Sequence, residues 1–282
     1  MSAVAATRIE PTETAPVPDR RTTLRRVVQS EWVKIRSLRS TWLTVSAILV
    51  VIVGFGAIAA MVAGGDIATP NGGAPGGGAD SSPLGTVLAG ANLAVLIVAV
   101  LGSIVGAREF STGMIRTTLS AVPKRLPVLW SKLATFTAVV LPVVAVGVVA
   151  AFFLGMSLLA GSGSATLSWT DDSVARSVVG TALYITGLGI IGLALGVLLR
   201  STAAAIGVGV GVVLFLPALA SALLPSSWDS VLKFLPSNAG GAFTSLGQSD
   251  AMLSPGVGAA VFAGWVALAI AGAAFALVRR DA

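Results

Sequence analysis

Six long apolar segments constrain this chain more than any other feature of its sequence. They span about residues 42–63, 86–106, 133–160, 174–199, 203–224 and 257–278. Each is close to the roughly 20 residues that an α-helix needs to cross a bilayer, and none carries Asp, Glu, Lys or Arg at membrane depth. Because 55% of the residues are hydrophobic and only 11% are charged, a soluble core of this size could not bury so much apolar surface. The pattern predicts an all-α membrane protein with six transmembrane helices in residues 42–282.

The distribution of basic residues predicts how these helices are oriented. Sixteen of the eighteen Lys and Arg residues lie before residue 42, within 107–132, at Arg200 or at the C-terminus. The other loops contain only Lys233, and Arg176 lies just inside the fourth segment. Since cytoplasmic loops are enriched in Lys and Arg, both termini are expected in the cytoplasm. The net charge of +6 therefore indicates topology, and no nucleic-acid partner is expected.

The residues before the first apolar segment divide into two parts. Residues 1–21 are polar and rich in Pro, which is typical of a disordered cytoplasmic tail. Residues 22–41 place apolar side chains at three- and four-residue spacing, with basic residues between them. This pattern predicts an amphipathic helix in the plane of an anionic membrane surface. Its candidate lipid contacts are Trp32, Lys34, Arg36 and Arg39.

Composition excludes several kinds of chemistry. The chain has no Cys and no His, so Ser–His hydrolysis and metal sites built from His or Cys are excluded. None of the four lysines follows a glycine, so the phosphate-binding G-x-x-x-x-G-K-[ST] loop is also missing. A transport protein without charged groups at membrane depth and without an ATP site is passive, or it uses energy supplied by a partner.

Glycine and proline within the apolar segments predict close packing and irregular helices. The pairs Gly192/Gly196 and Gly207/Gly211 have the small-xxx-small spacing that lets helices approach closely, within one protomer or between two. Pro142 and Pro217 are expected to kink their helices or interrupt the hydrogen bonding. In the loop 225–256, apolar residues at helical spacing predict a short surface helix.

The cytoplasmic segment 107–132 mixes basic residues with Phe110, Met114, Ile115 and Trp130. A solvated positive-inside loop explains the basic residues but not the apolar ones. The mixture favours short helices below the membrane that form a docking surface.

Three motifs resemble a known family. The run R-E-F-S-T-G-M-I-R-T-T-L, followed by A-V-P-K-R, is similar to the permease subunits of ABC-2 type exporters, especially the bacterial permeases that are encoded separately from their ATPase. S-E-W-V-K-I-R-S-L-R-S-T-W before the first segment and L-L-R-S-T-A-A-A between the fourth and fifth match the same family. The resemblance covers about residues 22–280.

The resemblance implies an ABC-2 (type V exporter-like) architecture in the bacterial plasma membrane, with short re-entrant helices in the last outer loop. It implies a separate ABC ATPase subunit that binds ATP and Mg, so no cofactor is expected in this chain. It also implies a second permease copy, identical or paralogous. Residues 108–125 would correspond to the coupling helix that contacts the ATPase. The candidate coupling residues are Arg108, Glu109, Thr112, Gly113, Arg116, Lys124 and Arg125.

Other functions remain open at this stage. The chain could be a passive channel or an assembly factor. A membrane-embedded lipid enzyme is a further alternative, but such enzymes cluster several Asp residues around metal and phosphate, and the only adjacent pair here is Asp171 and Asp172, on the outer side. The uncharged interior of the apolar segments favours lipids, apolar peptides or drug-like molecules over strongly ionic cargo.

Overall fold

The computed structural model describes residues 39–67, 82–111, 125–247 and 252–279, together with Gln29, Trp32 and Val33. Within these residues the regular structure is entirely helical. Five helices are long and apolar enough to cross a membrane. They are α2 (Arg39–Ala63), α4 (Ala89–Ser111), α6 (Arg125–Gly161), α7 (Val174–Leu199) and α12 (Pro255–Arg279). These helices confirm an all-α, multi-pass membrane protein.

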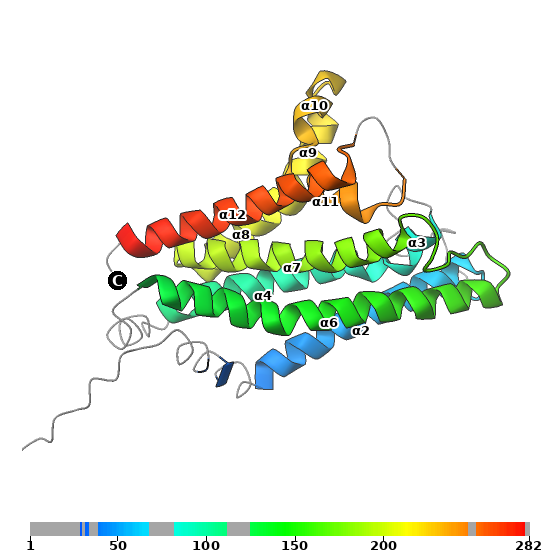
Figure 1. The fold of residues 1–282 in the computed structure, drawn as a ribbon, viewed down its shortest axis with the longest axis horizontal. Helices are drawn as coiled ribbons and strands as arrows, with labels where there is room; N and C mark the ends of the chain where they lie inside the picture. Colours follow the sequence, from blue (N-terminus) through cyan, green and yellow to red (C-terminus); the bar gives the residue numbers. More distant parts are fainter. Residues whose placement is uncertain are drawn as a thin grey trace, which may run out of the picture.

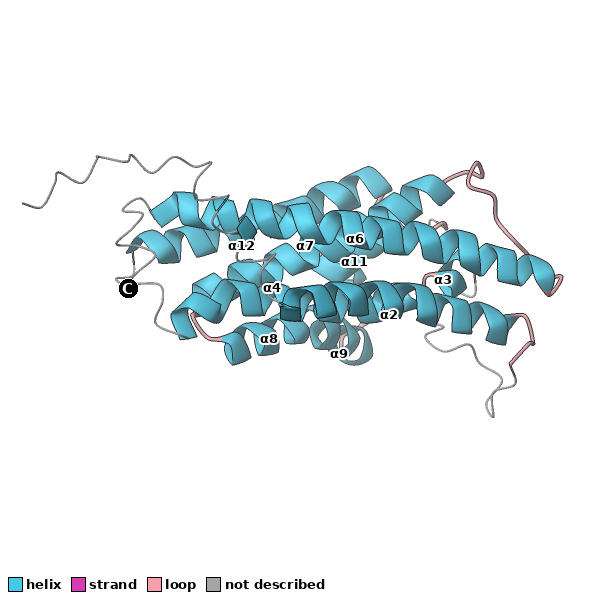
Figure 2. Ribbon diagram, turned by 90° about the horizontal axis from the view of Figure 1, so that it is seen from below, coloured by secondary structure: helices cyan, strands magenta, loops and turns pink. Residues whose placement is uncertain are grey.

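The long helices run along the longest dimension of the molecule (Figures 1 and 2). At one end of the bundle, on the left in Figure 1, α4, α7 and α12 end and α6 begins. We call this end the charged end, because it contains Arg108, Glu109, Arg200 and Arg279 at helix termini and Lys132 two turns into α6. The opposite end contains the short helix α3 (Pro83–Val87) and the first turns of α7.

Helix boundaries match the predicted spans closely for α7 and α12 but differ at the charged end. Helix α4 continues to Ser111 and α6 begins at Arg125, so both ends of the predicted loop 107–132 are helical. The early start of α6 has a reason in the sequence, because Leu126, Leu129 and Leu133 continue its apolar face to the N-terminal side of the expected span. At 37 residues, α6 is about 55 Å long and exceeds the hydrocarbon thickness of roughly 30 Å.

The predicted fifth span, 203–224, is helical but is not one regular helix. It consists of α8 (Thr202–Val210), a π-helical turn over Gly211–Phe215 and α9 (Leu216–Leu223). Pro217 explains the interruption, because it has no N–H for the carbonyl of residue 213 and its ring crowds that carbonyl. After this turn α9 rises away from the bundle (Figure 1), and Leu223 is 76% exposed.

The loop 225–256 contains short helices in its described part, as the sequence predicts. They are a 3-10 turn over Ser226–Trp228, α10 (Asp229–Leu232) and α11 (Pro236–Thr244). Helix α11 packs against α7 and α12. The indole Nε1 of Trp265 on α12 donates a hydrogen bond of 2.9 Å to the carbonyl of Phe234, which holds the preceding turn against the bundle.

Helices α4 and α7 form the centre of the bundle through glycine contacts. A Cβ atom at Gly102 or Gly106 of α4 would overlap the backbone of α7, and one at Gly192 or Gly196 of α7 would overlap the backbone of α4. The prediction that Gly192 and Gly196 permit close approach is therefore confirmed, within one chain. Gly207 and Gly211 have no neighbouring atom within 4 Å of the position that a Cβ would take.

Candidate functional site

A buried ion pair joins α4 to α6 at the charged end. The Nζ atom of Lys132 lies 2.8 Å from Oε1 of Glu109, and both side chains are less than a tenth exposed. Glu109 belongs to the last turn of α4, and Lys132 lies two turns into α6. Removing charges from water is costly, so such a pair persists only where each charge compensates the other. The pair therefore holds the last turn of α4 against the beginning of α6.

A second contact links α4 to the turn between α7 and α8. The guanidinium of Arg200 lies 5.1 Å from the ring centroid of Phe110, within the range of a cation–π interaction. Arg200 has a left-handed backbone conformation, with φ of 54°, and its N–H bonds the carbonyl of Gly196 to end α7. Ser201 then caps α8 by accepting from the N–H of Ala204. The end of α4, the end of α7 and the start of α8 therefore meet at this point.

The structure corrects one expectation about the coupling residues. Glu109 was expected on an exposed docking surface, but it is 6% exposed and pairs with Lys132. The physical reason is that α4 continues past residue 106, so that successive residues face different sides: Arg108 is exposed, Glu109 points into the bundle and Phe110 is half-buried.

Several other predicted site residues lie outside the described part of the chain. These are Thr112, Gly113, Arg116 and Lys124 of the coupling segment, and Lys34 and Arg36 of the interfacial helix. The predicted tail 1–21 also lies outside the described residues. Arg125 and Arg39 are the first residues of α6 and α2, and Trp32 is helical and exposed. Residues 112–124 connect the two helix ends that the ion pair holds.

The sequence reasoning missed Lys132 and Arg200 as site residues. Lys132 was interpreted as a residue of the basic loop and as the lysine that opens the third apolar segment in the motif behind the family resemblance. It lies on the same helical face as Leu129 and Phe136, which are buried. A lysine within an apolar stripe is a signal that it has a buried partner. Arg200 was interpreted as a topology marker at a tight turn and as part of the L-L-R-S-T-A-A-A motif, without a contact of its own.

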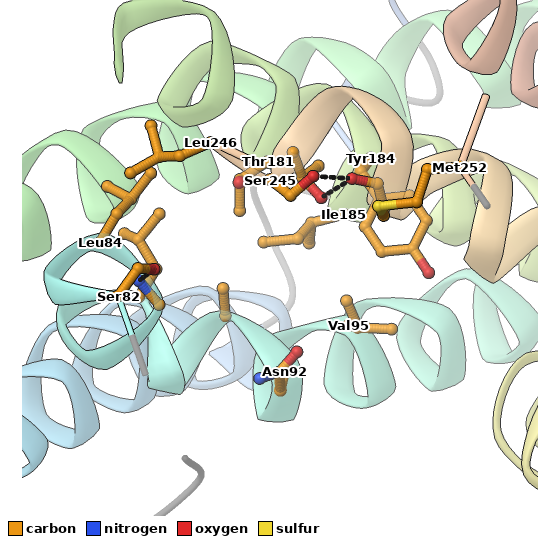
Figure 3. Close-up of a pocket in the computed structure, with 15 residues that line it drawn as sticks. Ser82, Leu84, Asn92, Val95, Thr181, Tyr184, Ile185, Ser245, Leu246 and Met252 are labelled. Carbon is orange, nitrogen blue, oxygen red and sulfur yellow. Dashed lines mark hydrogen bonds between the residues drawn. The ribbon is translucent and has the colours of Figure 1, made fainter. Parts of the chain in front are cut away.

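A cavity lies at the other end of the bundle, between α3 and α4 on one side and α7 and α11 on the other (Figure 3). Its volume is about 480 Å³. The wall includes Ser82, Asn92, Thr181, Tyr184, Ser245 and Met252. Within the described residues, no group of three Asp or Glu side chains is close enough to hold a metal ion.

Two side chains of α7 hold one wall of this cavity in place. Nη2 of Arg176 and Oγ of Ser177 both donate to the carbonyl of Ser245, at 3.0 and 3.1 Å. The ring of Tyr184 packs against Phe243 and Phe262, with centroids 6.4 and 5.2 Å away. These contacts fix the segment that follows α11 on the end of α7.

The apolar helices, the buried ion pair and the glycine-packed centre define a multi-pass α-helical membrane protein. Residues 76–281 match the model of a family described as "Protein of unknown function (DUF2705)". The chain belongs to this family, because the match covers well over half of its 282 residues. No curated protein matches the chain.

Proposed function

We propose that this chain is the membrane-embedded permease subunit of an ATP-driven exporter of the ABC-2 type. It would have six crossings in the bacterial plasma membrane and both termini in the cytoplasm. A separate ABC ATPase subunit would bind ATP and Mg, and a second permease copy would complete the transporter. The sequence motifs described above support this assignment.

The observation that best supports the proposal is the Glu109–Lys132 pair. Energy transfer from a partner requires a docking segment whose movement is passed to the helices rather than lost in a flexible loop. Residues 112–124 join Ser111 at the end of α4 to Arg125 at the start of α6. The pair links these two helices, with 2.8 Å between Nζ of Lys132 and Oε1 of Glu109. A push on this segment would therefore move both helices.

The α4–α7 interface supports the transmission of movement from α4 to α7. The backbones of the two helices touch along Gly102, Gly106, Gly192 and Gly196. Close-packed interfaces transmit displacement because there is little free space to absorb it. Movement of α4 at the charged end would therefore carry α7, which forms one wall of the cavity at the opposite end.

The test is reconstitution with candidate ABC ATPase subunits from the same organism, starting with any that is encoded near this gene. The chain alone in nanodiscs should hydrolyse no ATP, and the complex should hydrolyse it with a rate that falls to background when the partner's phosphate-loop lysine is replaced by Ala. Stable association and ATP-dependent export would support the proposal. Failure of every candidate ATPase to bind would contradict it and favour a passive channel or an assembly factor.

A further inference from the structure

The cavity between α3, α4, α7 and α11 has the size of a small-molecule site. Its volume of about 480 Å³ falls within the range of about 300–1,000 Å³ that is typical of ligand pockets. It is formed by three parts of the chain that are far apart in the sequence: the consecutive helices α3 and α4, helix α7, and α11 with the residues after it. Figure 3 shows labelled side chains from these three parts around one space.

The lining combines polar and apolar side chains without a formal charge. Hydroxyl or amide groups come from Ser82, Asn92, Thr181, Tyr184, Thr244 and Ser245, and hydrocarbon surface from Leu84, Leu88, Val95, Ile185 and Leu246, with the Met252 thioether beside them. A charged ligand would lose its hydration here without gaining an opposite charge, which is costly. The lining therefore favours a neutral molecule that has both a polar and an apolar part.

The hydrogen bonds of the lining specify what the polar part must offer. Three hydroxyl protons are already donated to backbone carbonyls of their own helices: Thr181 to Ser177 at 2.8 Å, Thr244 to Gly240 at 3.1 Å and Ser245 to Gly241 at 2.8 Å. These oxygens retain lone pairs and can accept from a ligand. The cavity is thus richer in acceptors than in donors, and a ligand with O–H or N–H groups suits it.

Two further groups add to this capacity. The Asn92 amide and the Tyr184 hydroxyl also line the cavity, and each of these groups can both donate and accept a hydrogen bond. The Tyr184 ring is held by Phe243 and Phe262, and a side chain at Gly240 would overlap it. A fixed ring presents its hydroxyl at a low cost in conformational entropy.

We propose that this cavity binds a neutral amphipathic molecule that carries hydroxyl donors on a hydrocarbon body, such as a monoacylglycerol or a smaller polyol ester. The site does not depend on the proposed transport function, since binding needs neither ATP nor a partner. Such a molecule can enter from the bilayer or from water, and the experiment below distinguishes these two sources.

The experiment uses the full chain in nanodiscs of phosphatidylcholine, without an ATPase, and a photoreactive monoacylglycerol as the probe. Peptide mapping after irradiation should place the cross-link in 82–95, 181–185 or 241–246, or at Met252. Gly241→Leu should reduce saturable labelling at least tenfold, because a Cβ at this position enters the cavity at an ordinary contact distance of 3.6 Å from Met252. Gly264→Leu, on a part of α12 with no neighbouring atom within 4 Å, is the matched control and should label like the wild type.

Tyr184→Phe keeps the ring and removes the hydroxyl, and it should weaken probe binding about fivefold at an unchanged melting temperature. Competition by monoolein alone would identify the bilayer as the source, and competition by water-soluble monobutyrin as well would identify a free molecule. Labelling that is non-saturable, or that is equal in Gly241→Leu and Gly264→Leu, would overturn the site. Loss of export with retained labelling would instead bear only on the proposed function.

Discussion

The ammonium group of Lys132 contacts the carboxylate of Glu109 at 2.8 Å, across 23 residues of sequence that include the whole segment between α4 and α6. Both side chains are buried, although Glu109 lies in the last turn of α4 and Lys132 only two turns into α6. The helices on either side of the segment 112–124 are therefore linked by a contact inside the protein and not at its surface.

Removing one member of this pair should be strongly destabilising. Lys132→Met would leave the Glu109 carboxylate buried without this partner, which typically costs about 3–5 kcal/mol. The double variant Glu109→Leu/Lys132→Met removes both charges and should recover most of the loss. Thermal unfolding in detergent measures both effects, with the exposed Arg108→Met as the control. Additive losses in the double variant would show that the two side chains act independently.

Adding a methyl group between α4 and α7 should also destabilise the protein. In Gly106→Ala the new Cβ would overlap the carbonyl oxygen of Leu193, so the helices must separate. Overpacking of this kind costs about 1–3 kcal/mol. Gly207→Ala on α8 meets no atom within 4 Å and should be neutral or stabilising, within about 1 kcal/mol. Equal melting temperatures for the two variants would contradict the close α4–α7 contact.

These two features differ in how far the sequence predicts them. Long apolar runs place α7 at 174–199 to the residue, because hydrophobic length and polar flanks determine a membrane helix locally. The spacing of Gly192 and Gly196 predicts close approach but not the partner, which is α4. The partner of Glu109 could not be predicted, because a pair across 23 residues depends on how two helices are rotated against each other.

Other parts of the structure have weaker signals. Pro217 predicts a disturbance in the fifth apolar segment, but whether it becomes a kink or a π-turn depends on how α8 packs against α4 and α7. The cavity has no motif at all. Asn92 and Tyr184 appear in the sequence as isolated polar residues of apolar helices, and only the packing of α3 and α11 brings them to one space.

The orientation of the bundle should place the charged end in the cytoplasm. The chain contains no native Cys, so single cysteines report without background. Thr170→Cys, which is exposed before α7, should react in intact cells with an impermeant maleimide. Ser111→Cys, exposed at the end of α4, should react only after the cells are lysed. Reaction of Ser111→Cys in intact cells would reverse the predicted topology.

Docking of the ATPase should depend on the exposed side of the segment that begins at Arg108. Arg108 projects from the last turn of α4, whereas its neighbour Glu109 faces inward, so the substitution is made on a different side of the helix from the buried pair. Charges at the rim of an interface change the association rate and its dependence on salt. Arg108→Glu should therefore weaken capture of the ATPase at least fivefold at low salt, with a smaller difference at high salt.

The matched control for this prediction is Arg279→Glu. Arg279 is exposed at the same end of the bundle and undergoes the same change of charge, but it belongs to α12, which is not joined in the chain to the segment 112–124. Gly113→Val tests the segment itself, because a β-branched side chain restricts a turn that glycine permits. Capture from membranes with matched amounts of each variant measures all three. We expect Arg279→Glu to bind like the wild type and the other two to lose binding. If all three variants capture the ATPase equally, the segment after α4 is not the docking surface, and the ion pair beneath it serves only to hold α4 and α6 together.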